Sequence, residues 1–262
     1  MEAIEDLREF ASEVAKEAGR LLKGMERPGI KIDYKGAIDL VTEADLRAEG
    51  LIIRRIKEKF PDHAVLSEEV GGERPGAEHL WIVDPLDGTT NYAHSYPIYA
   101  VSIAVEMRGE VVAGAVYDPT LDELFAASKG SGASLNGSEI RVSRIEDLDK
   151  SLLATGFPYY YRERPHEILA LFKDFLLRAQ GIRRAGSAAL DLCALACGRF
   201  DGFWELGLKP WDTAAGSLIL TEAGGAITKM DGSAFDIRVP ELLASNGAIH
   251  EQMLAVVKGV MA

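Results

Sequence analysis

Hydrophobic and polar positions alternate with a helical period in the first quarter of this chain of 262 residues. Apolar residues recur every three or four positions from Ile4 to Leu22, which predicts an amphipathic opening helix. Thr42 and Asp45 form a variant of the capping box and predict a second helix from Ala44 to about Phe60, with Asp45 in its first turn. Residues 27–38, between the two helices, contain Pro and Gly and are expected to form a loop or an irregular hairpin.

From about residue 64 to residue 143 the pattern changes to short apolar runs separated by Gly, Pro and Asp. Such runs are typical of strands in a mostly antiparallel sheet, with Arg108 and Gly109 as one hairpin turn. These predicted strands are Ala64–Leu66, Leu80–Val83, Tyr99–Val105, Val111–Tyr117 and Glu123–Ala127. From about residue 150, strands and helices alternate instead. The later strands are Leu152–Thr155, Phe200–Glu205 and Leu242–Ser245, and the later helices are Pro165–Ala179, Ser187–Cys197, Pro210–Ala223 and Ile249–Val257.

This change of rhythm predicts two halves with a boundary near residue 145. Residues 1–145 would form an α+β domain with an antiparallel sheet, and residues 146–262 an α/β domain. A chain of this length lies near the upper limit for one continuous hydrophobic core, so we expect either one large domain or two closely packed ones.

The composition restricts the class of partner. The formal net charge is −12, and nucleic acids and anionic membranes both require clustered Lys and Arg, so neither is expected to bind. A phosphorylated small molecule stays compatible with this charge, because a bound cation reverses the local field. No apolar run approaches a membrane span and no secretory signal is visible. Cys193 and Cys197 are expected to be two buried helical thiols rather than metal ligands, in a reducing cytoplasm.

The segment after the second predicted strand has the pattern of a cation site. Asp84 and Asp87 are three residues apart, with Pro85 between them and Gly88 directly after. Pro fixes φ and Gly tolerates sharp turns, so the chain is expected to bend tightly around whatever these carboxylates bind. Hard cations such as Mg²⁺ prefer compact sets of oxygen ligands, and the Leu86 carbonyl is placed to complete the set.

Other segments add acids or anion-binding groups. Backbone N–H groups of residues 88–90 are candidates for binding an anion, as turns and helix starts do. Glu68 and Glu69 close another predicted strand, and Asp212 begins a predicted helix. Each pattern alone has a simpler explanation, as an acidic surface turn or as a charge that favours a helix N-terminus. The prediction therefore rests on their combination.

In combination these segments resemble the inositol monophosphatase family along essentially the whole chain. The matching motifs are Asp39-Leu-Val-Thr-Glu-Ala-Asp45, Glu68-Glu69, Asp84-Pro-Leu-Asp-Gly-Thr-Thr-Asn-Tyr-Ala-His94, and Trp211-Asp212-Thr-Ala-Ala-Gly216 through Gly224-Gly225. Two of these motifs are long and match without gaps, which makes the resemblance specific. It implies the layered αβαβα fold of the Mg²⁺-dependent, lithium-sensitive sugar phosphatases, an active site between the two halves, and a homodimer.

The resemblance also implies a role for each matching residue. Glu68, Asp84 and the Leu86 carbonyl would hold a first Mg²⁺; Asp84, Asp87 and Asp212 would hold a second; and Glu68, with Glu69 beside it, would contact a looser third. Asp45 and Thr89 would orient and deprotonate the attacking water, and Glu68 joins them among the catalytic residues. Phosphate and substrate would be bound by Asp87, Gly88, Thr89, Thr90, Gly186, Ser187, Ala188 and Glu205.

Neighbouring residues are expected to have supporting roles. Lys35 either approaches the phosphate or is solvated, and Asp39 makes structural hydrogen bonds. His94 supports the site or lies at the surface. Arg184 meets either Asp191 or the edge of the substrate, and the ion pair is the favoured alternative.

We therefore expect a Mg²⁺-dependent phosphomonoesterase that hydrolyses inositol monophosphate, or a related polyol or sugar phosphate, through in-line attack by water. A fructose-1,6-bisphosphate 1-phosphatase, alone or as a second activity, and a 3′-phosphoadenosine 5′-phosphate phosphatase are alternatives with the same fold. The Thr-Thr-Asn-Tyr-Ala-His run and Glu205 favour inositol phosphate. A non-catalytic scaffold of this fold and a glycosidase with paired carboxylates are the alternatives from other functional classes.

Overall fold

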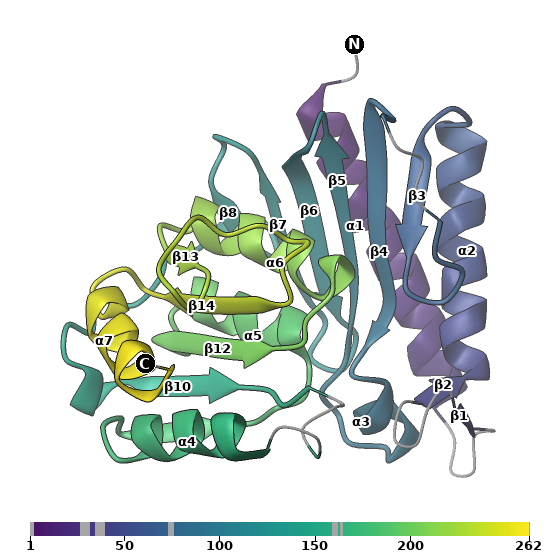
Figure 1. Cartoon of the computed structure of the whole chain (residues 1–262). Coiled ribbons are helices and arrows are strands. Elements are labelled where there is room, and N and C mark those ends of the chain that lie inside the picture. The colour runs from purple at the N-terminus through teal and green to yellow at the C-terminus, as the bar shows by residue number, and fades with distance from the viewer. Residues whose placement is uncertain are drawn as a thin grey trace.

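The computed structural model describes residues 3–26, 32–34, 40–72, 76–158, 162 and 165–261. Its elements form five layers, in the order helices, sheet, helices, sheet, helices (Figure 1). Helices α1 (Ile4–Met25) and α2 (Glu43–Lys59) cover the outer face of a seven-stranded sheet. The second helical layer consists of α5 (Ala188–Ala196) and α6 (Pro210–Glu222), and the third of α4 (Pro165–Leu176) and α7 (His250–Met261). The expected αβαβα fold is confirmed. Lys35 and Asp39 lie outside the described residues.

The first sheet has the strand order β3-β4-β5-β6-β7-β8-β9. Its strands are β3 (Ala64–Ser67), β4 (His79–Asp87), β5 (Ala100–Met107), β6 (Glu110–Asp118), β7 (Glu123–Ser128), β8 (Ala133–Leu135) and β9 (Ser138–Glu139). Only β3 and β4 run parallel, so the prediction of a mostly antiparallel sheet is confirmed. Arg108 and Gly109 both have positive φ, at 52° and 86°, as a tight hairpin between twisted strands requires.

The second sheet is mixed and has the strand order β11-β10-β12-β14-β13. Its strands are β10 (Leu152–Thr155), β11 (Gly181–Arg183), β12 (Gly202–Leu206), β13 (Ala226–Thr228) and β14 (Glu241–Ser245). Strand β10 pairs in parallel with β11 and β12, whereas β14 pairs antiparallel with β12 and β13. Strands β11 and β13 were not predicted, because three residues are too few to display an apolar period.

Two further short strands and two short helices complete the described structure. Strand β1 (Ile32–Tyr34) pairs antiparallel with β2 (Leu40–Thr42). Most of residues 27–38, where we expected a loop or an irregular hairpin, lie outside the described residues. Helix α3 (Thr89–Ala93) follows β4, and the 3-10 helix η1 (Leu148–Lys150) precedes β10.

The helical layer between the sheets joins both halves of the chain. Ala104 and Phe125 of the first sheet share one buried cluster with Leu192 of α5, Ile219 of α6 and Phe203 of the second sheet. Apolar burial is the main favourable contribution to folding, so this shared core holds the two sheets in a fixed relation. The division into domains at residue 145 stays a prediction about independent folding units.

Candidate active site

Strand β4 carries Asp84 and Asp87 to the edge of the central helical layer. The strand is longer than predicted and continues to Asp87, with a shift in its pairing with β5 between these two acids. Such a bulge re-aims side chains, which brings both acids to one end of the strand. Asp84 is 1% exposed, and the Leu86 N–H donates to its Oδ1 at 3.0 Å. We expected the chain to bend tightly around the ligand of Asp84 and Asp87. The tight turn lies after Asp87 instead.

Gly88 makes that turn. Its φ of 96° places it in the left-handed region, and it is the N-cap of α3. A Cβ at this position would lie 2.9 Å from the Ile98 carbonyl oxygen, so a glycine is required here for space as well as for conformation. The short helix α3 then begins with Thr89, which lines both cavities described below, and Thr90, which lines the second.

Asp45 of α2 lies against Thr89. The predicted capping box is confirmed: the Thr42 N–H donates to Asp45 Oδ2 at 2.8 Å, and the Ala44 N–H donates to the Thr42 hydroxyl at 3.1 Å. The second carboxylate oxygen of Asp45 lies 3.0 Å from the Thr89 hydroxyl, which lies equally close to the Leu86 carbonyl oxygen. Burial raises the pKa of Asp45. The two residues predicted to handle the water are therefore in direct contact.

Glu68 reaches the same region from the edge strand β3. In the parallel pairing, Ser67 is opposite Val83. The residues that follow them, Glu68 and Asp84, therefore lie beside each other. The Glu68 N–H donates to the Val83 carbonyl at 3.3 Å, which fixes this arrangement. Glu69 follows in the turn and is half-buried.

Asp212 arrives from the central helical layer. It occupies the first turn of α6, and its Oδ2 accepts a hydrogen bond of 2.7 Å from the Lys209 N–H. The Trp211 carbonyl accepts a bond of 3.3 Å from the Ser102 hydroxyl of β5, which attaches the start of α6 to the first sheet. Asp212 thus stabilises the N-terminus of its helix, which was the simpler explanation of its position. It also faces the acids of β4.

These acids line one cavity with a volume of about 230 Å³. Its lining consists of Glu68, Asp84, Leu86, Asp87, Gly88, Thr89, Gly207, Lys209, Trp211 and Asp212. Burial, and then the charges of Glu68, Asp87 and Asp212, raise the pKa of Asp84 well above its ordinary value. The pKa of Asp212 is raised well above its ordinary value by burial and then by Asp87.

The donor set of this cavity suits a hard divalent cation. Several carboxylates and a backbone carbonyl converge there, and cations such as Mg²⁺ bind oxygen ligands of this kind. Among the described residues, no three Asp, Glu, His or Cys side chains are already grouped as metal ligands. Asp87 directs its Oδ2 atom away from the other acids, to the Ser187 hydroxyl at 2.6 Å and the Ala189 N–H at 2.8 Å.

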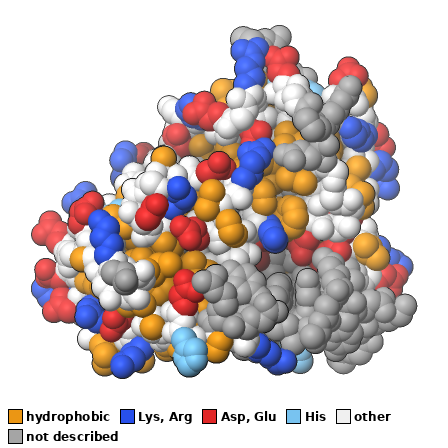
Figure 2. Space-filling view, viewed as in Figure 1, with side chains coloured by type: hydrophobic (Ala, Val, Ile, Leu, Met, Phe, Trp, Pro, Cys, Tyr) orange, Lys and Arg blue, Asp and Glu red, His pale blue; other side chains and the backbone are white. Residues whose placement is uncertain are grey.

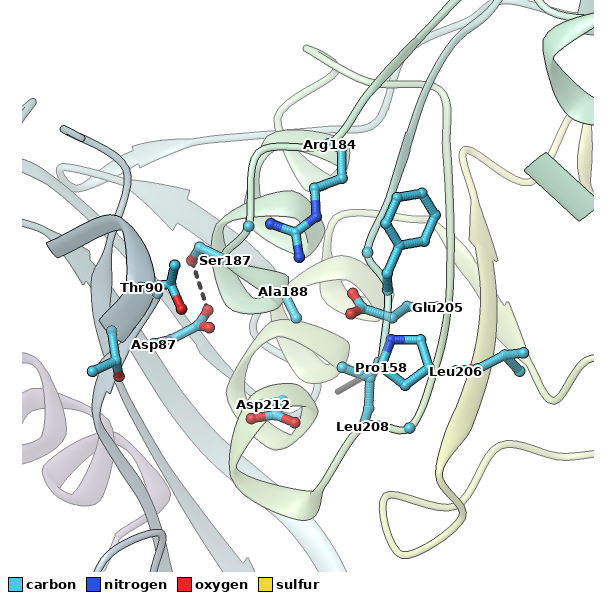
Figure 3. A pocket seen from close by; sticks show the side chains of 16 residues that line it. Asp87, Thr90, Pro158, Arg184, Ser187, Ala188, Glu205, Leu206, Leu208 and Asp212 are labelled. Atoms are coloured by element: carbon cyan, nitrogen blue, oxygen red, sulfur yellow. Dashed lines mark hydrogen bonds between the residues drawn. The ribbon is translucent and has the colours of Figure 1, made fainter. Parts of the chain in front are cut away.

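A second cavity of about 150 Å³ adjoins the first and shares Asp87, Gly88, Thr89, Gly207 and Asp212 with it (Figure 3). Gly186, Ser187 and Ala188 line it from the start of α5, and Glu205 lines it from β12. The pKa of Glu205 is raised well above its ordinary value, first by burial and then by the nearby charge of Asp191. All substrate-binding residues that we predicted line this cavity.

Arg184 also lines the second cavity, and its guanidinium and the Glu205 carboxylate point into the same space (Figure 3). The favoured ion pair with Asp191 is wrong, since no N and O atoms of these two described side chains lie within 4.0 Å of each other. Arg184 lies instead with its guanidinium carbon 5.8 Å from the centre of the Phe157 ring. Its charge still lowers the pKa of both Asp191 and Glu205 through space.

Sequence reasoning missed several residues of the site. Phe157, Pro158 and Leu208 line the second cavity from the loops that follow β10 and β12, and Leu206 lines it from the last position of β12. They are apolar residues at or beyond the ends of strands and carry no chemical signature, so no pattern identified them. The expectation for His94 was correct in part: the residue is exposed at the end of α3 and lines neither cavity. Of the two cysteines, Cys193 is buried and Cys197 only half-buried.

Comparisons with known proteins agree with this architecture of five layers around an acidic cavity. The model of the inositol monophosphatase family matches residues 3–262. An inositol-1-monophosphatase from Synechocystis sp. is 45% identical over 250 residues, which cover 94% of this chain and 86% of that protein. A protein from Vibrio cholerae named Nus factor SuhB is 43% identical over 240 residues, covering 90% of each. The solved structure of inositol monophosphatase from Anabaena (Nostoc) sp. superposes with a TM-score of 0.89 at 42% identity, covering 98% of this chain and 96% of that one.

The fold and its carboxylate-lined cavity define a phosphatase of small phosphorylated molecules. The chain belongs to the inositol monophosphatase family. Members of this family are generally Mg²⁺-dependent. Within the described parts of the chain, none of the helices has both the length and the apolar character needed to cross a bilayer.

Proposed function

We propose that this protein is a Mg²⁺-dependent phosphomonoesterase that hydrolyses inositol monophosphate or a closely related polyol phosphate. The observation that carries the proposal is the pair of adjoining cavities: one is lined by acids on three separate elements, the other by groups suited to a small polar molecule. The substrate would place its phosphate where the cavities meet, beside Gly88 and Thr89, and its hydroxyls against Glu205. The relative named inositol-1-monophosphatase supports this substrate.

The acids would divide among the ions as the family motifs imply. Glu68, Asp84 and the Leu86 carbonyl would hold one Mg²⁺, and Asp84, Asp87 and Asp212 a second, with Glu68 and Glu69 available to a third. Bound Mg²⁺ supplies Lewis acidity and lowers the pKa of a coordinated water. Asp84 would be a ligand of both the first and the second ion. This shared role agrees with its burial and with the three acids that raise its pKa.

Asp45 and Thr89 would prepare the water for attack. The Thr89 hydroxyl can donate to Asp45 and thereby leave its own oxygen to accept a hydrogen bond from the water. The proton of the water would pass to the Asp45 carboxylate, whose pKa is raised by burial and which is therefore a stronger base than an exposed Asp. The capping box holds that carboxylate in place.

The second cavity would orient the rest of the substrate. Ser187 and Ala188 start α5, and Glu205 can accept hydrogen bonds from substrate hydroxyls. Gly156 leaves the space for Glu205, because a Cβ added at Gly156 would overlap its carboxylate. These contacts would fix the leaving oxygen in line with the attacking water.

The test is release of phosphate from inositol 1-phosphate, fructose 1,6-bisphosphate and 3′-phosphoadenosine 5′-phosphate, each with Mg²⁺ and with a chelator. We expect the highest kcat/KM with inositol 1-phosphate and no turnover with the chelator. Asp87→Asn should abolish turnover while leaving the circular dichroism spectrum unchanged. No phosphate release from any of the three substrates, or full turnover by Asp87→Asn, would overturn the proposal.

Fructose 1,6-bisphosphate is a second candidate substrate, and the position of Arg184 favours it. The guanidinium lies at the exposed edge of the second cavity without an ion-pair partner among the described residues, where a second phosphate could bind it. Arg184→Ala should then raise KM for the bisphosphate by about tenfold, the value of one charge-assisted contact, and leave KM for inositol 1-phosphate nearly unchanged. Equal effects on both substrates would remove the support for this second activity.

We also propose that nucleic acid is not a direct ligand and that the protein forms a homodimer. The net charge is −12, and acidic and basic side chains are interspersed over the described residues of the face in Figure 2. The Nus factor name of the Vibrio cholerae relative makes the first statement worth testing. A gel-shift titration with RNA, and sedimentation of the chain alone, would test the two statements separately.

A further inference from the structure

Glu49 is a buried acid to which the proposed function assigns no role. It lies on α2 one helical turn after Asp45, is 2% exposed, and has no Lys, Arg or His partner among the described residues. Burying an ionised carboxylate costs free energy unless hydrogen bonds replace its hydration. The contacts of Glu49 therefore show what this carboxylate stabilises.

All of these contacts go to the turn that carries Glu68. The Glu49 Oε1 atom accepts hydrogen bonds from the Ser67 hydroxyl, from the Glu69 N–H at 3.1 Å and from the Val70 N–H at 3.1 Å. The ends of the turn are closed by two backbone bonds between Ser67 and Gly71. One carboxylate oxygen thus occupies the interior of the turn.

The outer part of this turn is not held by its apolar residue. The Val70 side chain is 71% exposed, so apolar burial does not hold it in place. Glu68 lies between two residues that donate to Glu49, and its own N–H donates to Val83 at 3.3 Å on the other side. The backbone of Glu68 is therefore fixed from α2 and from β4 together.

Helix α2 itself is a firm support. Ala48, Ile52 and Ile56 are buried in the outer core against α1 and the first sheet. Asp45 and Glu49 are four residues apart, so they project from the same face of the helix. One helix thus holds Thr89 through Asp45 and the Glu68 turn through Glu49.

We propose that Glu49 is a positioning residue that sets the affinity of the acidic cavity for divalent cations by holding the Glu68 turn. The inference rests on the proposed function, since it takes Glu68 as a cation ligand. Groups that hold metal ligands in place by hydrogen bonding are typically worth about 10- to 100-fold in metal affinity. The contact is made through a single oxygen, so a glutamine at this position retains an acceptor for the same three donors.

The experiment measures the melting temperature of the full chain against Mg²⁺ concentration, which reports binding to the folded state without substrate. In Glu49→Ala the Mg²⁺ concentration that produces a given rise in melting temperature should be about 10- to 100-fold higher. In Glu49→Gln it should stay within about threefold of the unsubstituted protein, because the acceptor oxygen remains. At saturating Mg²⁺, kcat of both variants should approach that of the unsubstituted protein.

Asp118 offers a matched control. It is 4% exposed, and its Oδ1 accepts from the Thr120 hydroxyl and from the N–H groups of Thr120 and Leu121, yet it lines neither cavity of the site. Asp118→Ala loses the same kind of contacts, so it should lower the melting temperature without changing the Mg²⁺ concentration that a given rise requires. An equal change of that concentration in this variant would show a general loss of stability and overturn the positioning role.

The remaining outcomes separate the two proposals. If the unsubstituted protein responds to Mg²⁺ and Glu49→Ala responds at the same concentrations, the positioning role is wrong and the proposed function stands. If the unsubstituted protein shows no Mg²⁺ response, both fail. Should Glu49→Ala not fold, Ser67→Ala removes one donor to the same oxygen, and an unchanged Mg²⁺ requirement in that variant counts against the proposal.

Discussion

The Asp87 carboxylate of β4 accepts a hydrogen bond of 2.6 Å from the Ser187 hydroxyl at the start of α5. The same oxygen accepts a bond of 2.8 Å from the Ala189 N–H. A negative charge at a helix N-terminus is favoured by the helix dipole. This contact joins the first sheet to the central helical layer in the middle of the candidate site.

Ser187→Ala should shift the acidic limb of the pH–rate profile upward. Burial raises the pKa of Asp87 to about 6, and the Ser187 bond opposes that rise, so its loss leaves the carboxylate protonated to higher pH. Ser187 is also the N-cap of α5, and removing a cap costs about 1 kcal/mol of stability. Urea unfolding checks the second value. An acidic limb that coincides with that of the unsubstituted protein would contradict the first expectation.

The metal-free protein should lose stability as the pH rises. The pKa values of Asp84, Asp191 and Asp212 are raised well above the ordinary value by burial, and that of Asp87 to about 6. As the pH rises above about 4, the unfolded chain releases these protons before the folded chain does, so unfolding becomes more favourable. The melting temperature in chelator should therefore fall from pH 5 to pH 8, and Mg²⁺ should restore it.

Asp191→Asn provides the control for this pH effect. Asp191 is 2% exposed and is not among the residues that we propose as cation ligands. The amide cannot ionise, so this variant should melt at a higher temperature than the unsubstituted protein at pH 8 in chelator, with a shallower dependence on pH. A steeper dependence would show that Asp191 is stabilised as a carboxylate.

Gly156→Ala should damage substrate binding more than stability. The added methyl group would overlap the Glu205 carboxylate and push it from its position in the second cavity. We expect KM for inositol 1-phosphate to rise by about tenfold, the value of one or two lost hydrogen bonds. Gly50→Ala is the matched control, because a Cβ there meets no atom within 4 Å and should stabilise α2 by about 0.5–1 kcal/mol. Equal KM values in both variants would remove the argument for Gly156.

Thr89→Ala should lower kcat by about 10²- to 10⁴-fold, the usual contribution of a group that handles a reacting proton. Thr89→Ser keeps the hydroxyl that lies 3.0 Å from Asp45 and should retain most of the activity. Steady-state kinetics at saturating Mg²⁺ measures both. If serine and alanine are equally inactive, the methyl group rather than the hydroxyl is what the site requires.

Elements with a long apolar period were predictable from the sequence. Helices α1 and α2 were expected within one to three residues of their observed ends, since each has a capping pattern or a clear amphipathic repeat. Strand β4 was predicted too short, because Pro85 and the acids on either side of it look like a turn. The strand continues through them by way of the bulge at Asp84 and Asp87.

Site residues were predictable only where their chemistry is local in sequence. Asp84 and Asp87 form one motif, whereas Glu49 lies 18 residues before Ser67 and is connected to the site only by packing of α2 on the sheet. Nothing in the residues around Glu49 distinguishes it from the solvated acids of a helix face. Arg184 was misassigned for a related reason: its distance from Asp191 depends on the course of the loop before α5, which no pattern fixes.

The position of β3 at the edge of its sheet affects how the site opens. An edge strand of four residues, paired on one side only, separates from its neighbour at a much lower free energy than the central strands do. Fraying of β3 that also breaks the bonds to Glu49 would withdraw Glu68, while Asp84, on the next strand, stays in place. Exchange of cations can therefore proceed by local opening, and Mg²⁺ should slow amide hydrogen exchange in β3 more than in β5.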